Sequence, residues 1–367
     1  MSLLSLSPEL LEQIAFNLDT LSCYRLAFVS RTLNSLVSKA PLHRVIYIEP
    51  ASDEGLTQTC QLIYDHFSDK PAYGLYVRHY DLSTAFASEQ DIQNQVVIYN
   101  LSIALLSLRW MTKLACFVAP ALLFRLPVAF CEARFKEILS VQSLVELHLQ
   151  APWGEAQHLD ILNLHKLSAL PRLRSLHLDG FPYPEPQDRS QSRNSLPRFG
   201  ENIDTLAVTS APVEATIGGL AELLSWFPKL RNLSLECGDE IPEDQAVELL
   251  IEKYSMLERL SFDAACVPRR RVAEDSLRHF TRLKSLTLEG GSCFKSTHLF
   301  HLPPSVTHLG LVHHSVIDIG AIAFLISRWI KDQSIRRVVR CSIQTDTAAW
   351  GKVIKVSFLP ACCSVHN

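Results

Sequence analysis

A six-residue phrase, apolar-x-x-apolar-x-apolar, returns seven times between residues 144 and 311, and it constrains this chain more than any other feature. The first positions of successive copies lie 23–30 residues apart. Apolar residues that alternate with polar ones place their side chains on one face of a β-strand. A strand that recurs so evenly predicts an array of repeats, each burying its apolar face against its neighbours. The copies are Leu144-Val-Glu-Leu147-His-Leu149, Leu173-Arg-Ser-Leu176-His-Leu178, Ile203-Asp-Thr-Leu206-Ala-Val208, Leu230-Arg-Asn-Leu233-Ser-Leu235, Leu257-Glu-Arg-Leu260-Ser-Phe262, Leu283-Lys-Ser-Leu286-Thr-Leu288 and Val306-Thr-His-Leu309-Gly-Leu311.

This phrase, at a period of about 20–29 residues, is typical of leucine-rich repeats. Amphipathic stretches at 219–227 and 244–254 separate some copies and predict helices on the other side of a parallel sheet. We therefore predict an α/β fold, an irregular leucine-rich-repeat solenoid over residues 46–340 with its strands inside and its helices outside. Looser copies begin at Val77 and Met111 and end in Leu82 and Cys116, and a degenerate one begins at Ile335.

The polar side chains of these strands are expected to point away from the core and to form an exposed surface. Their mixed charge does not indicate a particular partner. The candidate binding residues on this surface are Glu146, His148, Arg174, His177, Asn232, Arg259 and Lys284.

The N-terminal residues carry a helical pattern instead. Ser7 can cap free backbone amides, and the proline and glutamate after it suit a first helical turn. Leu10, Leu11 and Ile14 then fall on one helical face. A second helix is expected to end near Val29, and a third to begin near Ser30. Three short helices cannot bury enough apolar surface alone, so they require a partner, which is either the rest of the chain or another protein.

These residues resemble the F-box. The family typically shows a Leu-Pro-x-Glu-Leu-Leu start and a Leu-x-x-Val-Ser phrase in the second helix. This sequence places its proline one position later, at Pro8, and has Leu33 where many members carry tryptophan. The matching strings are Leu6-Ser-Pro-Glu-Leu-Leu-Glu-Gln-Ile-Ala-Phe-Asn-Leu-Asp, Leu26-Ala-Phe-Val-Ser-Arg and Leu36-Val, within an F-box domain placed at residues 1–45.

The resemblance implies a substrate receptor of a Skp–cullin–F-box ubiquitin ligase, with catalysis left to other subunits. The F-box would dock a Skp-family adaptor, and through it a cullin, while the repeats hold an unknown target protein. Two alternatives stay open: an F-box scaffold acting outside a ubiquitin ligase, and a hydrolase or ligand-binding repeat protein whose N-terminal helices are only a cap. The residues expected to contact the adaptor are Leu6, Pro8, Leu10, Leu11, Ile14, Leu18, Leu26 and Val29.

Composition narrows the partners and the compartment. The formal net charge is -3, so the chain lacks the net positive charge that would attract a polyanion. Nucleic-acid binding is therefore not expected. The most apolar region, residues 96–130, is interrupted by Arg109, Lys113 and Arg125, so no membrane span is expected. The start of the chain does not read as a signal peptide, and the 10 cysteines lack the spacing of a disulfide framework. These features indicate reduced thiols in the cytoplasm or nucleus.

We found no catalytic motif, no cofactor motif and no metal-binding spacing. The histidines near His298 and His301 lack the paired cysteines of a zinc site and are interpreted as surface or core residues. Residues 182–200, rich in proline, serine and arginine, predict a mobile insertion between repeats, with a partner-binding or phosphorylated loop as the alternative. Residues 341–367 do not fit the repeat and are expected to form a cap or a tail.

Overall fold

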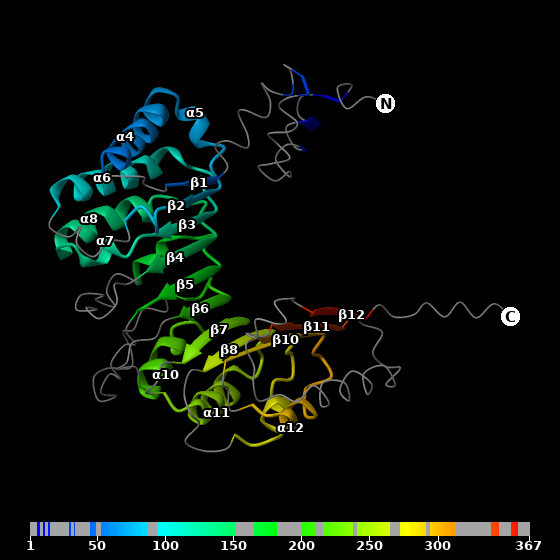
Figure 1. Ribbon diagram of the computed structural model, residues 1–367. Helices are drawn as coiled ribbons and strands as arrows, with labels where there is room; N and C mark the ends of the chain where they lie inside the picture. Colours follow the sequence, from blue (N-terminus) through cyan, green and yellow to red (C-terminus); the bar gives the residue numbers. More distant parts are fainter. Residues whose placement is uncertain are drawn as a thin grey trace. The chain divides into compact units, whose positions relative to one another are not determined.

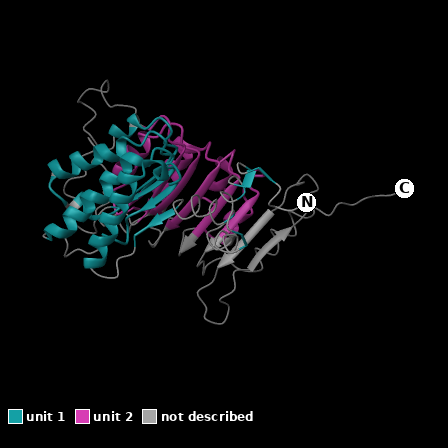
Figure 2. Cartoon of the chain, turned by 90° about the horizontal axis from the view of Figure 1, so that it is seen from above, with its two compact units in different colours: residues 1–177 teal, residues 178–367 magenta. Residues whose placement is uncertain are grey.

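The structure is a computed structural model, shown in Figure 1. It divides into two compact units, residues 1–177 and 178–367, and the division falls within strand β5 (Ser175–Asp179) (Figure 2). The residues that it describes are 6–7, 10–11, 14, 29–30, 33, 45–48, 53–86, 94–150, 165–181, 200–209, 216–237, 241–264, 272–290, 294–312, 339–344 and 354–358.

In the first unit, short parallel strands alternate with helices. Strands β1 to β4 pair in chain order, and all three pairings are parallel. The strands are β1 (Val45–Tyr47), β2 (His79–Asp81), β3 (Cys116–Ala119) and β4 (Glu146–Gln150). The helices are α4 (Asp53–Asp69), α5 (Pro71–Gly74), α6 (Gln95–Leu106), α7 (Leu122–Arg125) and α8 (Val128–Leu139), with the 3-10 turns η3 (Ser107–Trp110) and η4 (His165–Ala169).

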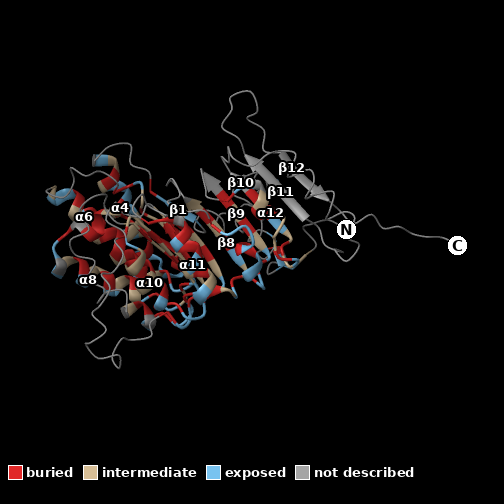
Figure 3. Cartoon of the chain, turned by 90° about the horizontal axis from the view of Figure 1, so that it is seen from below, coloured by how far each residue is buried: buried red, intermediate tan, exposed pale blue. Residues whose placement is uncertain are grey.

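One backbone arrangement repeats along this sheet and explains the sequence phrase. The carbonyl oxygen of the phrase's second residue accepts hydrogen bonds from two successive amides of the next repeat. The Arg78 carbonyl thus binds the amides of Ala115 and Cys116, and the Ala115 carbonyl binds those of Val145 and Glu146, all at 2.9 Å. Wherever their burial is described, the first, fourth and sixth residues of each phrase are buried, and together they form the core. Figure 3 colours the buried residues red.

This hydrogen-bond pattern corrects the predicted register of one repeat. Because Ala115 is equivalent to Arg78 and Val145, the phrase begins at Leu114 and not at Met111. Phe117 pairs with Leu147 in the sheet, as this shifted phrase requires. Both registers place buried apolar residues three apart, since Met111, Leu114 and Phe117 are all fully buried. The sequence pattern therefore fits either register, and the pairing of β3 with β4 shows that the phrase begins at Leu114.

The helices of the first unit pack against the sheet and against one another through apolar side chains. In α4, Leu56, Cys60 and Phe67 lie on the buried side. Helix α6 begins where the Asn94 side chain accepts a hydrogen bond from the Val96 amide at 3.0 Å. Its buried Asn100 donates to Thr57 Oγ1 of α4 at 2.8 Å, which fixes the two helices against each other.

The second unit repeats the same plan. Its strands β6 to β11 pair parallel in chain order. The helices predicted at 219–227 and 244–254 are present as α10 (Ile217–Ser225) and α11 (Glu243–Tyr254), which confirms both. The other elements are β6 (Thr205–Thr209), β7 (Asn232–Cys237), β8 (Arg259–Ala264), η5 (Ser276–His279), β9 (Ser285–Gly290), α12 (Ser296–Leu299), β10 (His308–Val312), β11 (Val339–Gln344) and β12 (Ile354–Phe358).

The C-terminal strands differ from the sequence pattern. In β11, Cys341 and Ile343 pair with Leu309 and Leu311 of β10, so this phrase also lies three residues after the position predicted from Ile335. Strand β12 runs antiparallel to β11. The segment expected as a cap or tail, residues 341–367, therefore contains the end of β11 and all of β12.

The predicted fold class, α/β with a parallel sheet and helices on one of its faces, is confirmed. Among the described helices, none has the length and apolar character needed to cross a membrane. Apart from Gly200, the expected insertion at 182–200 lies outside the described residues.

Candidate functional site

The first described piece of the N-terminal segment is a capped helical turn. The Leu10 amide donates to Ser7 Oγ at 3.4 Å, and the Leu11 amide donates to the Ser7 carbonyl at 3.0 Å. Ser7 therefore caps this helix as predicted. Leu10 and Ile14, one turn apart, are 49% and 36% exposed, whereas Leu11 is only 4% exposed. Two neighbouring leucines, about 100° apart around the helix axis, thus differ in burial, with Leu10 exposed and Leu11 interior.

A second capped turn begins at Ser30, whose Oγ accepts a hydrogen bond from the Leu33 amide at 3.1 Å. Leu33 is buried, so leucine serves as a core residue at the position where many F-box sequences carry tryptophan. Val29, just before the turn, is 68% exposed. Three of the residues predicted to contact an adaptor, Leu10, Ile14 and Val29, therefore present apolar side chains to the outside.

The remaining predicted adaptor contacts are placed differently or lie outside the description. Leu6 is half-buried and Leu11 is interior. Pro8, Leu18 and Leu26 lie outside the described residues. Leu11 is therefore a residue that holds the helix in place, and the outward surface is formed by its exposed neighbours.

The second candidate surface is the open face of the sheet, which we define as the third and fifth positions of each repeat phrase. These side chains point away from the helices. In the first unit the open face brings together three of the predicted target-binding residues, Glu146, His148 and His177. His148 Nε2 lies 2.6 Å from Glu146 Oε1, and His177 Nε2 lies 3.4 Å from the same oxygen. One carboxylate oxygen of Glu146 therefore contacts both histidines.

The two histidine rings stack on each other. Their centroids are 3.9 Å apart and their planes differ by 5°. Ser175 Oγ lies 3.1 Å from His177 Nε2. Burial lowers the pKa of His177, His148 lowers it further, and Glu146 opposes the change. A neutral His177 ring is therefore favoured at the pH where an ordinary histidine is half protonated.

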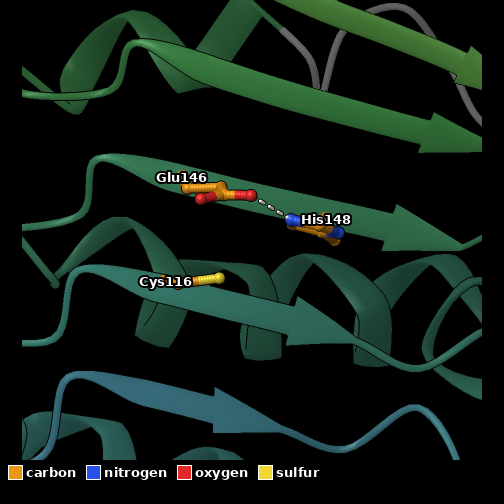
Figure 4. A group of neighbouring side chains, drawn as sticks. All are labelled: Cys116, Glu146 and His148. Atoms are coloured by element: carbon orange, nitrogen blue, oxygen red, sulfur yellow. Dashed lines mark hydrogen bonds and ion pairs between the residues drawn. The ribbon is translucent and has the colours of Figure 1, made fainter. Parts of the chain in front are cut away.

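Cys116 completes this group, and sequence reasoning missed it as a candidate. It is the sheet partner of Glu146, and its sulfur lies within 4.8 Å of donor atoms of Glu146 and His148 (Figure 4). Burial, together with the nearby carboxylates of Glu146 and Asp81, raises the pKa of the Cys116 thiol to about 12. The thiol is therefore protonated at neutral pH and is a poor nucleophile in this state.

The register error explains why Cys116 was missed. A phrase starting at Met111 makes Cys116 the last apolar position, which points into the core. The true phrase, starting at Leu114, makes it a third position on the open face. The seven clear copies carry serine, glutamate, asparagine, arginine, threonine or histidine there, so a correct register would have shown that a cysteine lies among polar residues.

In the second unit, Asn232 and Arg259 are sheet partners on the open face. Asn232 Nδ2 donates to Thr205 Oγ1 at 2.8 Å, and Arg259 is exposed. These two residues, predicted from separate repeats, are neighbours in the folded sheet. They provide a polar patch with one positive charge.

Two further predicted residues, Arg174 and Lys284, lie just before β5 and β9 and not within them. Both are exposed at the amino-terminal edge of the strands. Lys284 Nζ lies 2.5 Å from Glu258 Oε2, and Arg231 Nη1 lies 3.6 Å from Glu258 Oε1. The hydrogen bond from Lys284 lowers the pKa of Glu258, as do the charges of Lys284, Arg231 and Arg282. Lys284 is therefore paired with Glu258, which partly neutralises its positive charge.

His298, part of the histidine group noted in the sequence, is a core residue. It is buried on α12, where its Nδ1 accepts a hydrogen bond from the Lys295 amide at 3.0 Å. Its Nε2 lies 3.2 Å from the Val272 carbonyl oxygen. Both ring nitrogens thus bind backbone groups, and the residue fixes the start of its helix.

We compared the chain with protein families, with curated proteins and with solved structures. The family model of the F-box domain matches residues 3–45, so the chain contains an F-box domain there. A comparison with curated proteins gave no match. Among solved structures, a chain of the "Crystal structure of Rad7 and Elc1 complex in yeast" matches with a TM-score of 0.43 and 15% identity. The match covers 75% of this chain and 65% of that chain, so this chain spans less than two thirds of its length.

Proposed function

We propose that this chain is a substrate-recognition subunit of a Skp–cullin–F-box ubiquitin ligase. The observation that carries the proposal is the F-box domain at residues 3–45, with Leu10, Ile14 and Val29 exposed on it. Exposed apolar side chains in a short capped helical segment are suited to docking on an apolar partner surface. The helices would bind a Skp-family adaptor, which links the chain to a cullin.

The open face would hold the target protein. Its polar side chains are held by the sheet, and several are fixed by hydrogen bonds to one another, so binding costs little ordering of the site. The chain would then act by proximity, because a bound target is kept at high effective concentration near a ubiquitin-loaded enzyme. We further propose action in the cytoplasm or nucleus, in keeping with the free thiols of Cys60, Cys116 and Cys131.

The test replaces the two exposed residues of the first turn, in the variant Leu10→Asp with Ile14→Asp. Burial of the exposed part of each side chain is worth on the order of 1 kcal/mol, and each buried aspartate adds a further penalty. We expect adaptor affinity to fall by at least about a hundredfold in co-purification and calorimetry. The far-UV circular dichroism of the repeats should not change, because both side chains point outward.

Leu62→Asp is the matched control. Leu62 is equally apolar and 68% exposed, but it lies on α4 outside the F-box. This variant should bind the adaptor as the unchanged chain does. Full adaptor binding by the double variant would contradict the proposed docking surface. Adaptor binding without recovery of a cullin would indicate an F-box scaffold acting outside a ubiquitin ligase.

A further inference from the structure

We propose that Cys116, Glu146 and His148 form a zinc-binding site on the open face of the first unit. The three residues come from two adjacent strands, β3 and β4, which the parallel register places side by side. Their candidate ligand atoms, the Cys116 sulfur, a Glu146 carboxylate oxygen and a His148 ring nitrogen, all lie within 4.8 Å of one another (Figure 4).

The geometry requires only side-chain adjustment. Tetrahedral zinc, with bonds of about 2.0–2.3 Å, places its ligand atoms about 3.3–3.8 Å apart. His148 Nε2 and Glu146 Oε1, now joined by a hydrogen bond at 2.6 Å, would separate slightly to admit the ion. His148 would coordinate through an unprotonated Nε2, so the hydrogen that now joins the two groups would move through solvent to Nδ1 of the same neutral ring. The backbone of both strands would stay in register.

The donor set selects the kind of metal. A thiolate and an imidazole favour a borderline or soft ion, while calcium and magnesium prefer oxygen donors alone. Three protein ligands plus an open fourth position is a coordination that zinc commonly adopts. Binding requires the Cys116 thiol to lose its proton to solvent, so zinc would release one proton from the sulfur.

Neighbouring side chains support the three ligands. His177 Nε2, 3.4 Å from Glu146 Oε1, can hold the carboxylate in place as an outer partner, and its ring lies flat against that of His148. Asp81 on β2 is close enough to influence the Cys116 thiol and adds negative charge near the site. The local field therefore favours a cation. An ion here would tie the repeat of β3 to the repeat of β4.

The experiment titrates the full chain, stripped of metal with a chelator, with Co²⁺ and then with Zn²⁺. We expect about one Co²⁺ per chain, with the intense thiolate-to-cobalt absorption that only a cysteine ligand produces, and displacement of cobalt by zinc. Cys116→Ser should abolish that absorption. His148→Asn, at a half-buried position, should weaken binding at least about tenfold with Cys116 intact.

Cys131→Ser is the matched control, because Cys131 is a free thiol of the same unit on α8, away from the strands. This variant should keep the absorption and the affinity. Zinc should also raise the melting temperature of the unchanged chain and of Cys131→Ser, and not that of Cys116→Ser. Absence of the absorption in the unchanged chain, or its persistence in Cys116→Ser, would overturn the proposal. Adaptor binding is independent of these residues, so either result leaves the proposed function intact.

Discussion

At the scale of single residues, Leu10 and Leu11 show how far side-chain identity alone informs function. They are the same amino acid at adjacent positions, yet one is exposed and the other interior. The helical period predicts that they share an apolar arc, which is correct for an arc about 100° wide. Packing in the folded chain determines which of the two leucines stays exposed for a partner. For this reason the proposed variant changes Leu10 and leaves Leu11 in place.

A prediction at this scale concerns two glycines. A Cβ on Gly74 would lie 2.3 Å from the backbone oxygen of Trp110, which cannot move easily. A Cβ on Gly310 would meet only the Thr287 side chain, with Oγ1 nearest at 2.9 Å. Gly74→Ala should therefore lower the free energy of unfolding by about 1–3 kcal/mol, and Gly310→Ala by less. Urea denaturation measures both, and equal losses would contradict this account.

At the scale of elements, the repeat is held by backbone and side-chain contacts between equivalent positions. In the second unit, the Arg231 carbonyl accepts from the amides of Glu258 and Arg259, as the Ala115 carbonyl does in the first unit for its own neighbours. On the helical side, Tyr254 of α11 donates its hydroxyl proton to the Leu224 carbonyl of α10. In this part of the second unit, consecutive repeats are thus joined both along the sheet and between their helices.

The prediction at this scale is that Tyr254→Phe destabilises the chain in a pH-dependent way. At pH 8 the lost hydrogen bond should cost about 0.5–1.5 kcal/mol. Burial raises the pKa of Tyr254 to about 12 from an ordinary value of 10. The stability that Tyr254 provides is therefore complete below pH 10 and is lost as the pH rises toward 12, because only the unfolded chain then ionises.

Phenylalanine has no proton to lose, so the difference between the two proteins should shrink by about 1 kcal/mol between pH 8 and pH 10.5. Urea denaturation at these two pH values checks this expectation. A stability difference that stays constant between them would show that the hydroxyl is not shielded from solvent in the folded chain.

At the scale of the whole molecule, the proposed function uses two separate surfaces of one chain. In this proposal the F-box at residues 3–45 would provide the adaptor contact, and the open face would provide the target contact. If both assignments are correct, each activity can be removed without the other. Loss of adaptor binding would then abolish ubiquitination of a target that is still bound.

The matching prediction uses Arg259→Asp on the open face of the second unit. Arg259 is exposed beside Asn232, and reversal of its charge should reduce capture of target proteins at least about tenfold, as for a contact worth about 1.4 kcal/mol. Proximity labelling with the proteasome inhibited measures capture, and co-purification shows that adaptor binding is retained.

Lys253→Asp provides a charge-matched control, because Lys253 is an exposed residue of α11 on the helical side. It should leave target capture unchanged. If the Arg259 and Lys253 variants capture target proteins equally well, Arg259 does not contribute to target binding.

The sequence by itself determined the class of fold and the F-box. Both depend on local periodicity: an alternation of two residues in each strand, a helical period at Leu10 and Ile14, and capping serines at Ser7 and Ser30. Such patterns are encoded within a few neighbouring residues, and the structure reproduces them. The predicted helices at 219–227 and 244–254 follow the same rule.

Only the tertiary structure decided the exact register and the composition of the open-face group. Met111, Leu114 and Phe117 satisfy two alternative phrases, and the pairing of β3 with β4 selects between them. Antiparallel β12 has no repeat signal at all. The group of Cys116, Glu146, His148 and His177 spans more than 60 residues, so no spacing rule links its members. They meet because hydrogen bonds between separate repeats align their strands, and that alignment is a property of the folded sheet.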